Sequence, residues 1–72
     1  MAKKPKIDWR RLGREARTFI AEFYGSLREF GRITGMDKGT LSRIQRGHPV
    51  DTRNFLWICK ECSMNPWTFF VW

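Results

Sequence analysis

The sequence predicts an all-α protein, folded as one compact bundle of about five short helices. Apolar residues recur every three or four positions through most of the chain, and residues that cap helices stand before the periodic segments. No segment shows the alternating pattern of a strand. With 72 residues, of which 42% are hydrophobic, the chain can fill one small core.

The first predicted helix follows Asp8, a suitable N-cap, and ends near 24–25. Its apolar residues fall on one side of the helix: Trp9, Leu12, Ala16, Phe19, Ile20 and Phe23. Arg10, Arg14 and Arg17 form a basic stripe on another side. This stripe either approaches phosphates or only keeps the helix solvated.

The next two helices are predicted from their caps. Ser26 caps a helix over 27–34, and Glu29 completes a capping box with it. Asp37 caps a third helix that runs from position 38 to about 46 and stops at Gly47.

The spacing between these two helices indicates a helix-turn-helix. Gly31 leaves room for the second helix to cross closely, and Gly35 can adopt the positive φ that the corner needs. The residues expected to face the partner helix and the core are Leu27, Phe30, Ile33, Met36, Leu41 and Ile44.

A fourth helix starts at Asp51 or Thr52 and ends within 63–65, and Pro66 opens a last short helical turn. The inner face of the fourth helix is predicted to consist of Phe55, Leu56, Ile58, Cys59 and Cys62. The Cys59-x-x-Cys62 spacing occurs in zinc and redox sites, but no second pair accompanies it. Buried, reduced thiols are therefore favoured, and no metal or cofactor is expected.

The charge balance narrows the class of partner. Lys and Arg number 14 against seven Asp and Glu, a net charge of +7, which suits nucleic acid or an acidic membrane surface. No apolar run is long enough to span a bilayer and no secretory signal is seen, so we expect a cytoplasmic protein without a membrane partner. No set of catalytic residues or substrate cleft is apparent, which argues against an enzyme with a small-molecule substrate.

The N-terminal segment 1–7 is predicted to be a flexible basic arm, and 8–72 a single domain. Lys3, Lys4 and Lys6 either follow the minor groove of DNA or only aid solubility.

The stretch 26–64 resembles the Cro and lambda-type repressor helix-turn-helix family (XRE-like). The resemblance rests on the run Leu41-Ser42-Arg43-Ile44-Gln45-Arg46-Gly47 and on the two helices around Gly35. It implies a lambda-repressor-like fold and a sequence-specific transcriptional regulator of the repressor type, Cro-like or an immunity regulator, in a phage or bacterium. Such a protein binds double-stranded DNA in the bacterial cytoplasm or nucleoid.

The resemblance implies that the third helix enters the major groove. Its base-reading residues would be Lys38, Gly39, Thr40, Ser42 and Arg43. Lys38 and Arg43 can donate to guanine, and the Thr40 methyl can contact thymine. The expected phosphate-binding residues are Ser26, Leu27, Arg28, Arg46, His48 and Arg53, of which each of the last three either binds phosphate or is only an exposed charge. Gly39 has no side chain, which either allows the backbone of the helix to approach the DNA more closely or reduces the number of bases that the helix can read.

Aromatic residues crowd the last six positions of the chain. Trp67, Phe69, Phe70 and Trp72 are candidates for self-association, as in a homodimer on a palindromic site. Alternatively, Trp67 and Phe70 close the core while the others cover Trp57.

Two other functions remain open at this point. One is an antitoxin or accessory factor that binds a protein through the aromatic C-terminus while the helix-turn-helix autoregulates its operon. The other is an architectural protein that binds DNA without sequence preference.

Overall fold

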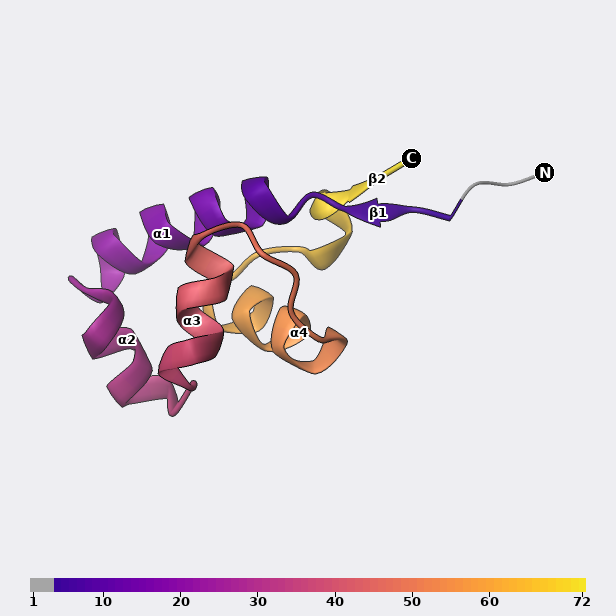
Figure 1. The fold of residues 1–72 in the computed structure, drawn as a ribbon. Coiled ribbons are helices and arrows are strands. Elements are labelled where there is room, and N and C mark those ends of the chain that lie inside the picture. The colour runs from indigo at the N-terminus through magenta and orange to yellow at the C-terminus, as the bar shows by residue number, and fades with distance from the viewer. Residues whose placement is uncertain (1–3) are drawn as a thin grey trace.

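The computed structural model describes residues 4–72, and its elements follow one another along a mostly helical chain (Figure 1). They are β1 (Lys6–Ile7), α1 (Trp9–Phe23), α2 (Leu27–Thr34), α3 (Lys38–Gln45), α4 (Thr52–Glu61), the 3-10 turn η1 (Pro66–Phe69) and β2 (Phe70–Val71). The predicted helical class is confirmed. The number of helices was wrong, since the described residues form four α-helices and the fifth segment is a single 3-10 turn.

The first three α-helices begin at the predicted capping residues, and the fourth is capped by Asp51, one of its two predicted starts. The side chains of Asp8, Ser26, Asp37 and Asp51 accept hydrogen bonds, 2.9 to 3.1 Å long, from the backbone N–H three residues ahead. The capping box at Ser26 forms only in part, because the Glu29 carboxylate pairs with Arg32. Local sequence therefore determines where the helices begin.

The helix ends depend on residues in the left-handed region. Gly35 ends α2 with a φ of 81°, as the corner to α3 requires. Helix α4 ends at Glu61, slightly earlier than predicted, and Ser63 follows it with a φ of 54°. A non-glycine residue with positive φ gives no clear sequence signal, which explains the difference.

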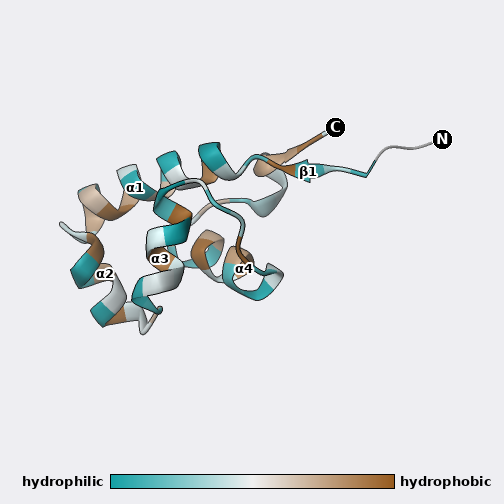
Figure 2. Cartoon of the chain, in the orientation of Figure 1, coloured by the Kyte–Doolittle hydropathy of each residue, from teal (hydrophilic) through white to brown (hydrophobic). Residues whose placement is uncertain are grey.

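The core is one cluster to which every α-helix contributes. Its members are each at most 4% exposed: Leu12, Ala16, Ile20, Phe30, Met36, Leu41, Ile44, Phe55, Ile58, Cys59, Cys62 and Phe69. In Figure 2 the hydrophobic parts of the helices turn mostly toward one another. Three predicted inner residues, Phe23, Ile33 and Leu56, are instead about half exposed or more. Periodicity identifies the apolar side of a helix, but it does not say how far the neighbouring elements extend.

Two glycines allow α3 to pack closely against other helices. A Cβ atom on Gly31 would lie 3.2 Å from the Leu41 side chain, which confirms the predicted close crossing of α2 and α3. A Cβ atom on Gly13 would lie only 2.3 Å from the backbone oxygen of Ile44. Helix α1 therefore crosses the end of α3 in backbone contact, and sequence reasoning missed this role of Gly13.

The two ends of the described chain meet in a small antiparallel sheet. Lys6 pairs with Val71 and Ile7 with Phe70, and the Asp8 N–H continues the ladder with a 2.7 Å bond to the Phe69 oxygen. The prediction that no strand forms was wrong, as was the prediction of a flexible arm as far as position 7. Lys3 lies outside the described residues. We call β1, η1 and β2 the strand end; its sheet projects beyond the helices (Figure 1).

Candidate nucleic-acid interface

Helix α3 has one buried side and one exposed side. Leu41 and Ile44 are buried, whereas Gly39, Arg43 and Arg46 are exposed. At 100° per residue these three lie within about 60° of one another around the helix axis. The helix is held from within by its contacts with α1 and α2. A basic outer surface is thus presented on a firmly packed helix.

The five predicted base-reading residues do not share one direction. Lys38, Gly39 and Arg43 are exposed, but Thr40 and Ser42 are half-buried. Lys38 and Arg43 leave the axis about 140° apart, so Lys38 stands on the flank toward α2 rather than beside Arg43. The Thr40 hydroxyl donates a 3.4 Å hydrogen bond to Asp37 Oδ2, which also accepts the Thr40 N–H at 3.1 Å. Arg43 is the most directly presented of the polar side chains.

The position of Gly39 has a structural reason that the sequence did not reveal. A Cβ atom there would lie 3.0 Å from Asp37 Oδ2, the atom that caps α3. Glycine therefore leaves space for the cap, in addition to exposing backbone on the outer side of the helix.

A groove of about 600 Å³ lies between α2 and α3. Its lining combines apolar residues with three cations: Leu27, Arg28, Gly31, Arg32, Met36, Lys38 and Leu41. We call it the α2–α3 groove. It brings Leu27 and Arg28, predicted to bind phosphate, next to Lys38, predicted to read bases. Arg32, expected to face outward but not included among the phosphate contacts, lies four residues after Arg28 on the same side of α2.

A second depression, of about 400 Å³, lies beside the start of α2. Ser26 and Leu27 line it together with Arg17 from α1 and Gln45 from α3. Arg17 thus belongs to the same surface as the predicted phosphate contacts, while Gln45 had no sequence signal. The Ser26 hydroxyl oxygen already accepts the Glu29 N–H at 3.1 Å as the helix cap.

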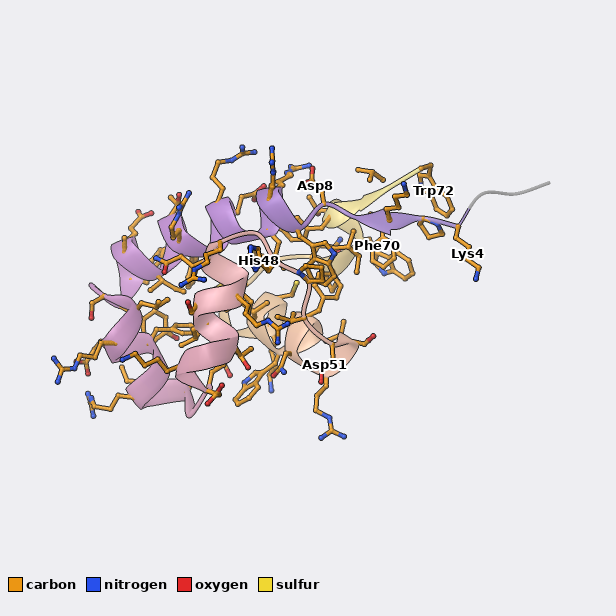
Figure 3. All side chains as sticks on the ribbon, in the orientation of Figure 1. Lys4, Asp8, His48, Asp51, Phe70 and Trp72 are labelled. Atoms are coloured by element: carbon orange, nitrogen blue, oxygen red, sulfur yellow. The ribbon has the colours of Figure 1, made fainter. Side chains whose placement is uncertain are left out.

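The remaining predicted phosphate contacts surround the C-terminal end of α3. Arg46 forms the C-cap of this helix, and the His48 N–H donates a 2.9 Å bond to the Arg43 oxygen. Both side chains are exposed, as is Arg53 on α4. Figure 3 shows His48 in the loop that leaves α3, near α1.

Most acidic side chains are engaged within the molecule, whereas most basic ones are not. Three aspartates cap helices. Glu15 pairs with Arg11, Glu29 pairs with Arg32, and Glu61 accepts the Trp57 indole N–H at 3.2 Å. Within residues 4–72 those two arginines are the only cations in ion pairs. Arg28, Lys38, Arg43, Arg46 and Arg53 keep unneutralised charge at the surface.

The two cysteines of α4 and its C-cap lie in the core. Both are free and buried, and burial raises the pKa of Cys59 from 9.0 to about 11. Burial, with the nearby Cys59 and Glu61, raises the pKa of Cys62 to about 12. The thiols stay protonated at neutral pH, and thiolate is the form that binds metal. No cluster of three metal-ligating side chains occurs in the described part of the chain.

The C-terminal aromatics divide between core and surface in an unexpected way. Phe69 is 1% exposed and fills the core, so it was wrongly assigned to a self-association surface. Trp67, predicted as one alternative to close the core, is instead 73% exposed, and Trp72 is 80% exposed. Phe70 is half-buried, with its ring 6.2 Å from that of Phe55. The short 3-10 turn sets which rings point inward, and its geometry does not follow the α-helical period.

No helix among the described residues combines the length and apolar character needed to cross a membrane. Comparison of the chain with protein-family models, with curated proteins and with solved structures found no match.

Proposed function

We propose that this protein binds double-stranded DNA through α2 and α3, acting as a helix-turn-helix with α3 in the major groove. The observation that carries the proposal is the exposed side of α3, where Gly39, Arg43 and Arg46 line one side of a helix whose other side is buried. A helix of this width fits the major groove of B-DNA, where base edges can be read.

The surface around α3 has the charge that such binding requires. Arg28 and Lys38 flank the α2–α3 groove, and Arg17 stands beside the start of α2. Since most carboxylates are occupied by caps and arginines, these cations are available to neutralise phosphates. Each phosphate contact releases counterions and so contributes to affinity in a salt-dependent way.

We further propose a regulatory role of the repressor type, in which the bound domain blocks access to a promoter in a phage or bacterium. Arg43 would donate to guanine, while Arg28 would bind the backbone and fix the orientation. The role proposed for Arg43 rests on its exposure and on its place around the α3 axis, and that of Arg28 on its exposure beside the α2–α3 groove.

A non-specific architectural role is the second candidate, because α3 offers few groups for base readout. Gly39 has no side chain, and the Thr40 hydroxyl is engaged with Asp37. This leaves Arg43, Lys38 and the half-buried Ser42. A protein with so few readers would bind many sequences with similar affinity.

The test is selection of binding sites from a pool of random duplex DNA at near-physiological salt. Enrichment of a motif that contains at least one G·C pair in each half-site supports the specific regulator. Retention of DNA without enrichment, together with a steep salt dependence, supports the architectural candidate. Failure to retain DNA contradicts both and directs attention to the strand end as a site for a protein partner.

A further inference from the structure

The strand end exposes more apolar surface than folding requires. Trp67 and Trp72 are 73 and 80% exposed, and Val71, which precedes Trp72 in β2, is 47% exposed. Within the described chain β2 has one neighbour, β1, so its other edge is open. Exposed apolar strand edges are templates for pairing with another chain. Figure 3 shows Trp72 on the projecting part of this sheet, with Phe70 closer to the helices.

The hydrogen-bond pattern identifies the groups on the open edge. The Asp8 N–H donates to the Phe69 oxygen, and the register pairs Lys6 with Val71. In an antiparallel sheet every second residue of a strand forms backbone hydrogen bonds with the same neighbouring strand. Since Phe69 bonds β1, the backbone N–H and oxygen of Val71, two residues later, also point toward β1. Those of Phe70 and Trp72 then point away from it. The Phe70 N–H is used within the 3-10 turn, where it donates to the Trp67 oxygen. The Phe70 oxygen and the Trp72 N–H are left for a new partner.

We propose that β2 pairs with β2 of a second copy of this chain, around a two-fold axis at Val71. Each Trp72 N–H then donates to the Phe70 oxygen of the other copy, and the two Val71 residues face each other. The result is a four-stranded antiparallel sheet in the order β1-β2-β2-β1. This inference concerns the strand end alone and does not depend on DNA binding.

The side chains match this register. Phe70 and Trp72 lie on the same face of the strand, because they are two residues apart. Antiparallel pairing around Val71 therefore sets Phe70 of each copy opposite Trp72 of the other, an aromatic cross-strand pair. Trp67 extends the same cluster, since its ring centre lies 5.1 Å from that of Phe70. The arrangement is complementary to itself, as a two-fold interface must be.

Charge and area also agree with a second copy. Lys6 lies on β1, the outer strand on each side of the four-stranded sheet. The Lys6 residues of the two copies are therefore three strand spacings, about 14 Å, apart, and salt screens the repulsion between their charges. A fully exposed tryptophan side chain has a surface area of about 250 Å². If Trp67 and Trp72 of both copies were completely buried in the dimer, roughly 800 Å² of surface would be removed from water. This lies below the roughly 1,200 Å² of stable interfaces, so we expect a weak dimer that forms only at high micromolar concentration.

The first test measures molecular mass by sedimentation equilibrium, without DNA, from low to high micromolar concentration. The wild-type chain should pass from monomer to dimer. The double variant Trp67→Ser, Trp72→Ser should stay monomeric with an unchanged circular dichroism spectrum. Phe23→Ser is the matched control, because Phe23 is a 66% exposed aromatic on α1, away from the sheet, and this variant should still dimerise.

The second test examines the register. Facing residues in a non-hydrogen-bonded pair have Cα atoms about 4.5 Å apart, within the range of a disulfide. Val71→Cys should therefore form a covalent dimer on mild oxidation, whereas Phe23→Cys should not.

Three results would overturn the proposal. They are a monomer at every concentration, a dimer that the double tryptophan variant retains, and equal cross-linking through positions 71 and 23. A monomer whose tryptophans instead mediate binding to vesicles of anionic lipid would assign the surface to a membrane. None of these results bears on whether DNA is bound.

Discussion

The α2–α3 region and the strand end both expose side chains that the fold does not need, but of opposite chemistry. Around α2 and α3 the surface carries cations such as Arg28 and Arg43, over a core of buried apolar residues. At the strand end it carries Trp67 and Trp72. The two proposals rest on this separation, since a cationic surface suits a polyanion and an exposed apolar surface suits another apolar surface. Because the two surfaces and the core consist of different residues, substitutions can change folding, DNA binding or self-association one at a time.

The largest effect is expected at the aromatic that joins the strand end to the core. Phe69→Ala should lower the free energy of unfolding by about 3 to 5 kcal/mol, because it empties a fully buried site. Trp72→Ser should change it by less than about 0.5 kcal/mol, because the ring is exposed. Urea denaturation of dilute protein measures both. Similar losses for the two variants would mean that the strand end is not divided into core and surface as described.

The next effect tests how firmly α3 is held. Gly13→Ala should cost about 1 to 3 kcal/mol, since the new methyl group meets the Ile44 backbone oxygen and α1 must move away. Gly39→Ala is the matched control, a helical glycine that faces only the end of the Asp37 side chain. There the gain in helix propensity, about 1 kcal/mol, offsets the contact. Thermal unfolding of both variants compares them, and a stable Gly13→Ala protein would show that the crossing can relax.

A third prediction concerns binding rather than folding. Arg43→Ala should weaken DNA binding by about 1 to 3 kcal/mol and relax the preference at one base pair, while Arg28→Ala should weaken binding to all sequences alike. Titration of selected and scrambled duplexes measures the difference. Both side chains are exposed, so the unfolding free energy should stay within about 0.5 kcal/mol of wild type. Equal losses on every sequence would contradict the roles assigned to the two arginines.

At neutral pH the smallest effect is that of the thiols of α4, which contributes Cys59 to the core, because their contribution to stability changes only at alkaline pH. The folded-state pKa values of Cys59 and Cys62, about 11 and about 12, lie above the usual 9.0. The unfolded chain therefore loses these protons first, and the contribution of the thiols to stability is complete below pH 9 and declines as the pH rises toward 12.

The double variant Cys59→Ala, Cys62→Ala isolates this contribution. Its unfolding free energy should fall less steeply than that of wild type between pH 8 and about 11. Lysine and tyrosine titrate in both proteins and cancel in the comparison. Parallel pH profiles would show that the thiols do not contribute.

The sequence predicted the features that local chemistry determines. The caps Asp8, Ser26, Asp37 and Asp51 locate every helix start, because a cap bonds an amide three residues away. The features that were missed depend on residues distant in the chain. The role of Gly13 requires knowledge of where α3 passes, and β1 has no strand pattern without β2.

The candidate site was predictable to a similar degree. The exposure of Arg43 and Lys38 follows from helix periodicity, whereas their role in reading bases stays a prediction that rests on the resemblance. The engagement of Thr40 with Asp37 is a local contact at the cap of α3 that was overlooked, whereas the place of Gln45 beside Arg17 follows from the packing of α3 against α1. Of the C-terminal aromatics, Phe69 rather than Trp67 enters the core, because a 3-10 turn has a different period from an α-helix.

The pairing of Lys6 with Val71 has a consequence for the order of folding. It closes almost the whole described chain into a loop, so its entropic cost is met only after the intervening helices have made the chain compact. A chain still emerging from the ribosome can assemble α1, α2 and α3 while β2 is not yet made. Because β2 follows all four α-helices in the chain, its open edge can form only after those helices have been made.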